Sequence, residues 1–472
     1  METVDTATIP AARREPPPFR LDEDEEINPA FVDAVSDAVG AGDRGRVSLL
    51  VEDLHQADVG TLLEALEPEE RPQLIELLGR DFDFSALTEV DDAVREEILE
   101  ELETETVAEG VRDLDSDDAV YILEDLTDAD QAEILQHLPA VERVALQRAL
   151  DYPEDSAGRL MQTEFIAVPP FWTVGQTIDF MRETEELPDT FYEIFVVDPG
   201  IRLLGSVPLD KLLRSKRPVR ISGIMLDEPD QVEATDQQED VARRFQRYNL
   251  VSAAVIDEAG RLVGVITIDD VVDVIEEEAD AEIKALGGVK PDEELSDNVW
   301  EIARGRFTWL LVNLLTAILA SAVIGLFEKS LEKMVALAVL MPIVASMGGN
   351  AGTQSMTVAV RALATRNLGR GNVRRIVGRE ILVGLINGVA FALVMGVVAV
   401  VWFGLPSLGP VIGLALIVTL TSAAFGGIVI PVLLDRFEVD PAVASGPFVT
   451  TITDVVGFFA FLGIATLWFG LG

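Results

Sequence analysis

One acidic residue lies deep inside the last apolar stretch of this chain. Asp454 is the single ionisable residue of the segment 446–471, one turn after Thr450. A carboxylate at that depth costs at least about 2.5–3.5 kcal/mol to insert, which makes it a candidate functional group by default. No Lys or Arg in the core of an apolar stretch can neutralise it. Two interpretations stay open: a protonated Asp454 with a structural hydrogen bond, or a carboxylate whose missing partner is a cation. We favour the cation.

A second apolar stretch, 334–363, carries a narrow polar stripe. At about 100° per residue, its polar side chains fall within a sector of roughly 100°; they are Ser346, Asn350, Thr353, Gln354 and Thr357. Lipid satisfies no hydrogen bonds, so the stripe must face protein or water. Glycines at 348, 349 and 352 permit another backbone to approach closely. The stripe either forms hydrogen bonds between packed helices or lines a polar path. The candidate lining residues are Gly349, Asn350, Thr353, Gln354 and Thr450.

These stretches belong to five apolar segments, each long enough to cross a bilayer with about twenty residues. They cover residues 307–327, 334–363, 381–403, 411–434 and 446–471. Arginines gather between the second and third segments, whereas the connection between the first and second holds Lys329 and Lys333 as its only basic residues. Loops rich in Lys and Arg stay in the cytoplasm. We therefore expect a multi-pass protein of the cytoplasmic membrane, with its N-terminus inside and its C-terminus outside.

The chain divides sharply by charge. Residues 1–298 hold 25 Lys and Arg against 74 Asp and Glu, a net charge of −49, whereas residues 299–472 carry +3. Nucleic acid is excluded as a partner, because phosphate binding needs a basic surface. Six Lys against thirty Arg, together with the excess of acids, fit a halophilic surface adapted to a salty cytoplasm. Specific cation sensing is the other interpretation.

Two absences narrow the chemistry. There is no Cys, which excludes disulfides, thiolate metal sites and Cys nucleophiles. His55 and His137 are the only histidines, so a His-based zinc centre or a catalytic triad is excluded. No nucleophile–base pair or phosphate-binding Gly loop with its Lys is present, and we do not expect an enzyme. Residues 1–20 lack an apolar core, so we expect a disordered tail there and no signal peptide.

Residues 21–150 are predicted to form an acidic, all-helical domain. Apolar residues recur at intervals of three and four, and short acidic breaks such as Asp115–Asp118 and Thr127–Asp130 supply helix N-caps. Short helices on a quasi-repeat favour a solenoid-like arrangement.

Residues 151–268 contain two copies of a β-β-α pattern. Gly205 and Gly264 are equivalent positions, 59 residues apart, and the turn glycines Gly200 and Gly260 are expected at positive φ. This α+β tandem resembles a pair of CBS domains. CBS pairs often bind adenine nucleotides through a Thr or Ser and an Asp three residues later.

The second copy carries that nucleotide pattern as Thr267 and Asp270, whereas the first copy has Pro208 and Lys211 at the equivalent positions. ATP or another adenine nucleotide is therefore a candidate cofactor. The alternative is a purely structural sensor scaffold.

Residues 269–298 are predicted as an acidic connecting helix that ends before Gly287 and Gly288. Its acids share a sector of roughly 100°; they are Asp269, Asp273, Glu276, Glu277 and Asp280. Another face is expected to carry Val272, Ile275, Ala279 and Leu286. Like charges one turn apart destabilise a helix by about 0.2–0.5 kcal/mol per pair. A divalent cation, or merely salt, would relieve that repulsion.

The order of these parts is similar to that of the MgtE family of magnesium channels. The resemblance covers nearly the whole chain past residue 20. Its most specific motifs are Pro342 with Gly349-Asn350-Ala-Gly352-Thr-Gln354, Arg361-Ala-Leu, Asp440-Pro441, Asp454-Val-Val-Gly457, and Tyr152-Pro-Glu-Asp ahead of Gly158-Arg-Leu-Met161. The resemblance implies a homodimer whose five-helix membrane domain, residues 299–472, holds hydrated Mg²⁺ at Asp454 and Asn350 between the subunits. It also implies that cytosolic Mg²⁺ closes the pore, with segment 269–298 as the plug.

Candidate regulatory ligands follow from the same resemblance. They are Asp118 in the helical domain, Asp236 in the second CBS copy, and Asp270, Asp273, Glu278 and Glu282 on the connecting helix. The chain departs from the family at Gln238 and Asn249, where other members can carry acids, and at Thr353, where some have a second Asn. Oxygen ligands suit a small, hard ion that keeps its waters, but they do not rank Mg²⁺ against Mn²⁺, Co²⁺ or Zn²⁺.

Two rival functions stay open. A proton- or sodium-coupled carrier would use Asp454 as its relay and would give no single-channel currents. A membrane-anchored nucleotide sensor would transport nothing, would bind ATP or AMP strongly, and would tolerate Asp454→Ala.

Overall fold

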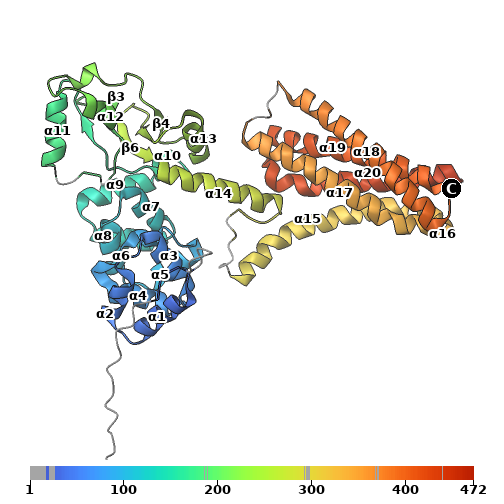
Figure 1. Cartoon of the computed structure of the whole chain (residues 1–472), viewed down its shortest axis with the longest axis horizontal. Helices are drawn as coiled ribbons and strands as arrows, with labels where there is room; N and C mark the ends of the chain where they lie inside the picture. Colours follow the sequence, from blue (N-terminus) through green and yellow to red (C-terminus); the bar gives the residue numbers. More distant parts are fainter. Residues whose placement is uncertain are drawn as a thin grey trace, which may run out of the picture. The chain divides into compact units, whose positions relative to one another are not determined.

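The chain folds into two compact units, Met1–Glu277 and Glu278–Gly472. The structure is a computed structural model that describes residues 17–20, 27–184, 187–188, 190–291, 293, 298–366, 368, 371–437 and 439–471. Figure 1 colours the elements in chain order. The tail expected at residues 1–20 lies almost wholly outside the described residues, because the structure describes only 17–20 of it.

The first unit begins with a helical domain built around one hydrophobic core. Its helices are α1 Pro29–Gly40, α2 Arg44–Val51, α3 Gln56–Ala65, α4 Glu70–Leu78, η1 Gly79–Asp81, η2 Phe84–Leu87, α5 Asp92–Glu101, α6 Thr104–Arg112, α7 Ser116–Glu124, α8 Asp128–His137 and α9 Ala140–Leu150. The apolar residues at three- and four-residue spacing, among them Leu62, Ile75, Ile98 and Leu123, are buried together in that core. Asp43 and Thr127 accept backbone hydrogens as N-caps of α2 and α8.

A recurring side-chain cap gives the helical domain its repeat. Arg71, Arg95 and Gln131 each donate hydrogen bonds to the backbone carbonyls of the residues eight and five positions earlier, over distances of 2.8–3.4 Å. These carbonyls belong to the last turns of the preceding helices, where no intrahelical donor remains. At these three places, one long side chain fastens a helix to the end of the segment before it.

Two small sheets of identical topology follow, as predicted for a CBS pair. The elements are α10 Ala157–Leu160, β1 Ala167–Val168, α11 Val174–Glu183, β2 Glu193–Val197, β3 Leu203–Pro208, α12 Leu209–Arg214, η3 Ile221–Gly223, β4 Gln231–Glu233, α13 Gln238–Tyr248, β5 Ser252–Ile256 and β6 Leu262–Thr267. In each sheet a parallel strand precedes an antiparallel hairpin, in the orders β1-β2-β3 and β4-β5-β6. Gly205 pairs with Val196 and Gly264 with Val255, so the two glycines are equivalent.

The turn glycines differ from expectation in one copy. Gly260 has φ +73°, as predicted, but in the first copy the positive φ belongs to Ile201 and not to Gly200. The backbone N–H groups of Gly200 and Arg202 both donate to the Asp198 carboxylate, which fixes the turn around Ile201. In the second copy the backbone N–H groups of Ala259 and Arg261 donate to Asp257 in the same way, so both copies have the same turn, and Ile201 stands where the second copy has Gly260.

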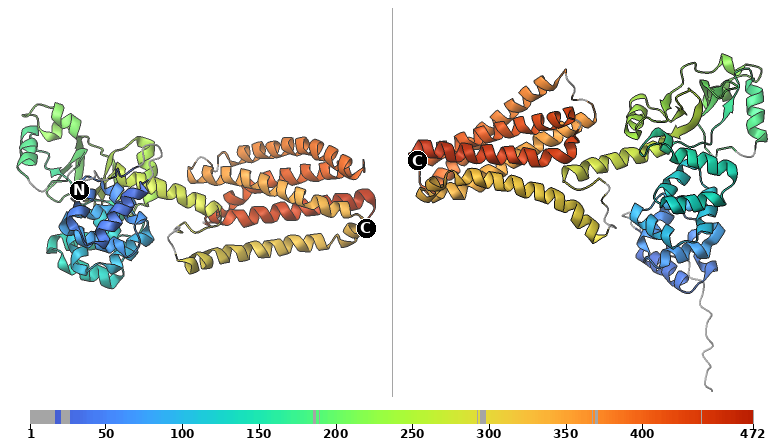
Figure 2. Two further views of the ribbon diagram at one scale, coloured as in Figure 1. Left: turned by 60° about the horizontal axis from the view of Figure 1, so that its bottom comes forward. Right: turned by 180° about the vertical axis from the view of Figure 1, so that it is seen from behind.

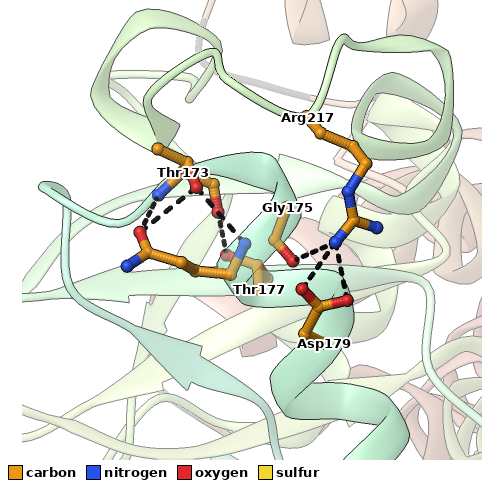
Figure 3. Close-up of polar contacts among 6 residues, drawn as sticks. Thr173, Gly175, Thr177, Asp179 and Arg217 are labelled. Carbon is orange, nitrogen blue, oxygen red and sulfur yellow. Dashed lines mark hydrogen bonds and ion pairs between the residues drawn. The ribbon is translucent and has the colours of Figure 1, made fainter.

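The start of α11 shows how the CBS helices are anchored. Thr173 and Gln176 form a capping box, and the Arg217 guanidinium binds both carboxylate oxygens of Asp179, at 2.7 and 2.5 Å, and the Gly175 carbonyl (Figure 3). Figure 3 shows Arg217 reaching over the helix from the loop after α12.

Helix α14, Ile268–Leu286, begins in the first unit and ends in the second. Its predicted apolar face is wrong at Val272, which is half exposed, because Val271 and Val274 are the residues that enter the core of the second CBS copy. The N-terminus of the helix determines which residues face the core, because the Thr267 hydroxyl donates to Asp269 and Asp270 directly after β6 and fixes where the helix begins. The helix ends before Gly288, which has φ +74°.

Among its described residues, the second unit contains five helices long and apolar enough to cross a membrane. They are α15 Val299–Gly325, α17 Val335–Ala364, α18 Val373–Phe403, α19 Leu408–Arg436 and α20 Pro441–Phe469, with the short α16 Glu328–Lys333 between the first two. The third begins eight residues before the predicted position 381, because the exposed Arg374, Arg375 and Arg379 continue the helix beyond its apolar part. The first also begins eight residues before its predicted position, 307, the end of the third is as predicted, and the remaining bounds shift by one to five residues.

Helix α19 is the centre of this bundle, and the five long helices run side by side in both views of Figure 2. It packs against α17, α18 and α20, while α15 packs mainly against α20. Pro342, Pro431 and Pro447 lie inside α17, α19 and α20 without ending them, as neighbouring helices in a membrane permit.

Candidate functional site

Asp454 lies on α20 beside the seam between α17 and α20. Its side chain is half buried, and no hydrogen bond or ion pair joins the carboxylate to another residue that the structure describes. The preceding residue, Thr453, is buried and donates its hydroxyl hydrogen to the Thr450 carbonyl, 2.9 Å away. Thr450 itself is exposed and stands one turn before Asp454 on the same helix face. A protonated Asp454 with a structural hydrogen bond was the alternative interpretation of the sequence, and the described residues contain no such hydrogen bond.

The polar stripe of α17 lies on the outside of the single chain. Asn350, Thr353, Gln354 and the two flanking members Ser346 and Thr357 are exposed, whereas the opposite face of the helix is buried against its neighbours. The amide of Asn350 is 3.5 Å from the Ser346 hydroxyl, which is a weak contact. A stripe of amides and hydroxyls directed away from its own bundle needs water or another protein surface.

Small residues let α17 approach α19 and α20. A Cβ on Gly348 would lie 2.7 Å from Thr419 Cγ2, and one on Gly352 would lie 2.7 Å from Val449 Cγ1 and 3.1 Å from Thr453 Cγ2. Gly349 points the other way, with nothing within 4 Å of such an atom. The glycines predicted for close approach therefore divide: 348 and 352 face the seam, and 349 belongs to the open side with Asn350.

One Asp454 is an incomplete metal site. Among the described residues, no group of three or more Asp, Glu or His lies in an arrangement that could hold a metal ion. Mg²⁺ binds through one or two carboxylates and keeps most of its waters. Asp454 supplies one such carboxylate, and exposed amides and hydroxyls of α17 can bind the waters.

A second acidic region lies within the first unit, between α7 and the start of α14. Burial, together with the nearby charges of Asp115 and Glu89, raises the pKa of Asp118 to about 6. Burial likewise raises the pKa of Asp270 to about 7, assisted by Asp269 and opposed by the hydrogen bonds from Thr267. Carboxylates that face one another out of water favour protonation or a cation of their own.

Neighbouring acids extend this region. The pKa of Asp273 is raised by burial and then by Glu89 and Asp269, and that of Asp117 is raised well above its ordinary value by burial and then by Asp270 and Asp118. Asp118, Asp270 and Asp273, which were candidates, thus share one region, whereas Asp117 and Glu89 were missed because they resemble ordinary N-cap and surface acids in sequence. All donors here are carboxylate oxygens, which suit a hard divalent ion.

Arg95 is a deeply buried cation of the same helical domain. It is 1 % exposed, and its guanidinium lies 2.5 Å from Asp125, 2.6 Å from Asp92 and 4.2 Å above the Tyr121 ring. These contacts join α5 to α7 and so hold the helix that carries Asp117 and Asp118. The sequence signal is weak, since Arg95 is one basic residue among many acids.

The remaining regulatory candidates lie elsewhere. Asp236 accepts a hydrogen bond from the Glu233 backbone at 3.0 Å and so stabilises the turn after β4. Glu278 lies on α14 at the boundary of the two units. Glu282, also predicted as a metal ligand, is paired with Arg361 at 2.5 Å within the second unit. The predicted regulatory residues therefore differ in their contacts.

Thr267 and Asp270, the candidate nucleotide-binding residues, are hydrogen-bonded to each other. The Thr267 hydroxyl lies 3.0 Å from Asp270 Oδ2, and together they cap α14. The cavity that includes Thr267 has a volume of about 10 Å³ and is also lined by Glu164 and Glu193. That is room for about one water molecule, and its acids would repel phosphates.

Comparisons with known proteins follow the same division of the chain. Residues 54–155 match the MgtE intracellular N domain, residues 157–217 and 221–277 match CBS domains, and residues 341–464 match the family MgtE, described as a divalent cation transporter. The magnesium transporter MgtE of Thermus thermophilus is 34 % identical over 451 residues, 92 % of this chain and 97 % of the relative. The magnesium transporter MgtE of Bacillus subtilis is 29 % identical over 417 residues, 88 % of this chain and 92 % of the relative.

Two solved structures each align with 52 % of this chain. The cytosolic domain of the Mg²⁺ channel MgtE in complex with ATP is 30 % identical, with a TM-score of 0.49, and the alignment covers 52 % of this chain and 99 % of that one. The soluble part of a magnesium transporter is 25 % identical, with a TM-score of 0.46, covering 52 % and 98 %.

Proposed function

Since this chain belongs to the MgtE family of divalent cation transporters, we propose that it is a Mg²⁺ channel of the cytoplasmic membrane, with its pore between two copies of the chain. Helices α17 and α20 of each copy line the pore, with Asp454 as the ion-binding residue. Asn350, Gly349, Thr353, Gln354 and Thr450 line the path beside it.

The observation that carries this proposal is the half-buried Asp454 carboxylate without a partner among the described residues. Two such side chains across a two-fold axis supply a charge of −2, which matches one divalent ion. The exposed stripe of α17 supports the same arrangement, because a second copy would remove it from lipid. Conduction also requires an ion to leave, and a single carboxylate per subunit, acting through the waters of the ion, binds weakly enough.

The acidic region between α7 and α14 supports control by cytosolic Mg²⁺. Asp118, Asp270 and Asp273 repel one another when charged, so a divalent ion binds more tightly to the conformation that holds them together. By linkage, the ion shifts the equilibrium toward that conformation in proportion to its differential affinity. Because α14 continues into the second unit, we propose that this state is the closed one, with α14 as the plug.

The orientation proposed is the one with an inside N-terminus and an outside C-terminus. Arg361, Arg366, Arg374, Arg375 and Arg379 then lie on the cytoplasmic side, as the distribution of positive charge requires.

Mg²⁺ uptake in a Mg²⁺-starved host tests the pore. We expect Asp454→Ala and Asp454→Asn to abolish uptake, and Thr450→Ala, a change one turn away without loss of charge, to retain part of it. Asp273→Asn combined with Glu278→Gln should keep uptake but lose its shut-off at high internal Mg²⁺. Normal uptake by Asp454→Asn would exclude the proposed ion-binding role.

Single-channel recording separates this channel from a coupled carrier, which gives no currents of that size. ATP titration of the full chain and of Asp270→Asn tests the predicted nucleotide contact. Strong ATP binding together with normal function of Asp454→Ala would instead identify a nucleotide sensor.

A further inference from the structure

The C-terminal end of α14 is held on the membrane helices by one ion pair. A guanidinium nitrogen of Arg361, near the end of α17, lies 2.5 Å from a carboxylate oxygen of Glu282. The Glu282 side chain is 21 % exposed and that of Arg361 is 62 % exposed. Both residues belong to the second unit.

The next turn of α14 packs into an apolar cluster. Ala285 is 4 % exposed, and with Leu286 it contacts buried residues of α17, α19 and α20, namely Met356, Val360, Ile430, Ala442 and Val449. Val449 directly precedes Thr450, and Met356 follows Gln354 by two residues, so the cluster adjoins the proposed lining. Two residues before Ala285, the Ile283 side chain is 68 % exposed.

Apolar packing alone gives this docked end little specificity, because Ala285 is small and Leu286 is only partly buried. The ion pair adds direction, because it joins Glu282 to a basic residue two turns along α17 from Gln354. Charge-assisted pairing of a carboxylate with Arg is directional as well as attractive.

We infer that Arg361 is the positioning residue that holds the end of α14 against the pore helices in the closed state, and that Glu282 is its docking partner and not a Mg²⁺ ligand. The inference rests on the proposed function for the meaning of the closed state. It assigns Glu282 a role that differs from its predicted one.

The two roles of Glu282 give opposite expectations for Arg361. If the ion pair docks α14, removing the guanidinium frees the helix end, and more Mg²⁺ is needed to close the pore. If Glu282 binds Mg²⁺, removing a competing cation strengthens Mg²⁺ binding, and less Mg²⁺ is needed. Loss of the Glu282 charge weakens closure in both cases, so Arg361 is the informative position.

The first test measures Mg²⁺ uptake by the full chain against internal Mg²⁺. Arg361→Gln should raise the Mg²⁺ concentration that halves uptake by about 2- to 5-fold, the range for a partly exposed ion pair. Glu282→Gln should act in the same direction, and the exchanged pair Glu282→Arg with Arg361→Glu should restore closure toward wild type. Arg379→Gln is the matched control, since Arg379 is 64 % exposed and paired with its neighbour Glu380. An unchanged or lowered half-inhibiting concentration in Arg361→Gln overturns the inference.

The second test is independent of transport and uses the absence of native Cys. At high Mg²⁺, Ala285→Cys should react slowly with a maleimide, and Arg361→Gln should accelerate that reaction, whereas the exposed Ile283→Cys should react fast in both backgrounds. If Ala285→Cys reacts as fast as Ile283→Cys, the end of α14 is not docked on the pore helices, and this conclusion holds for any result of the uptake test. If uptake does not depend on internal Mg²⁺ but Arg361→Gln still accelerates the reaction of Ala285→Cys, the proposed gating is wrong and the docking of α14 by Arg361 is supported.

Discussion

Gly427 is the position at which the packing of the membrane helices can be tested most directly. A Cβ there would lie 2.6 Å from the Gly352 carbonyl oxygen, 2.8 Å from Ser355 Cβ and 3.0 Å from the Met356 nitrogen. Two of these three atoms are backbone atoms of α17, which no side-chain rotation can move. Gly427→Ala must therefore push α17, with its polar stripe, away from α19.

The magnitude follows from two opposed effects. Overpacking of this kind costs about 1–3 kcal/mol, and contact with rigid backbone places Gly427→Ala near the upper end. Replacing a helical Gly by Ala returns up to about 1 kcal/mol. We expect a net loss of about 2 kcal/mol, or a midpoint of thermal unfolding lower by about 4–8 °C for a unit of this size.

The assay is thermal denaturation of the purified full chain at one fixed scan rate, because membrane proteins unfold irreversibly. Gly378→Ala on α18 is the matched control: it is also helical, and nothing lies within 4 Å of its added Cβ. It should be as stable as wild type or more so. If Gly427→Ala is as stable as Gly378→Ala, the close approach of α17 and α19 does not exist.

Two further predictions concern the first unit. Arg95→Leu should destabilise the helical domain by about 3–5 kcal/mol, the cost of breaking a buried ion pair. Arg95→Gln should cost less, because Gln131 makes the same two carbonyl contacts at the equivalent position. Hydrogen exchange of α5 and α7 measures both losses of stability, and equal losses would show that Gln cannot replace Arg as the repeated cap. The raised pKa values of Asp118 (about 6) and Asp270 (about 7) mean that the folded state binds protons that the unfolded state releases. Without divalent ions, protection of α7 should therefore fall as pH rises from about 4 through about 7, and Asp118→Asn should flatten that dependence.

The candidate residues of the second unit could be named from the sequence because their signals are local. The α17 stripe depends on helical periodicity alone, and the structure leaves all five of its polar residues exposed. Asp454 stands out because the rest of its segment is apolar. The second copy that we propose against this face could not be inferred from periodicity, since a stripe at a dimer interface and a stripe along a water-filled path have the same spacing.

The acidic region was only partly predictable because its contacts join distant segments. Asp118 and Asp270 lie on helices separated by the whole CBS pair, and nothing in the pattern around Asp117 or Glu89 distinguishes them from surface acids. The apolar face of α14 was wrong by one residue because the cap at Thr267 sets the start of the helix. Glu282 was assigned by position, whereas its partner Arg361 is 79 residues away.

The origin of the acidity can now be tested, because burial separates two kinds of carboxylate. A surface adapted to salt needs acids in contact with water, where concentrated salt reduces the Debye length to about 3 Å at 1 M. Asp117, Asp118 and Asp270 are instead partly buried, where screening by salt is weaker, and burial raises their pKa values. At pH 8, Mg²⁺ should therefore protect the backbone of α7 and the start of α14 from hydrogen exchange even in 1 M KCl, and KCl alone should not. If KCl alone gave the same protection as Mg²⁺, these acids would belong to the salt-adapted surface and would sense nothing.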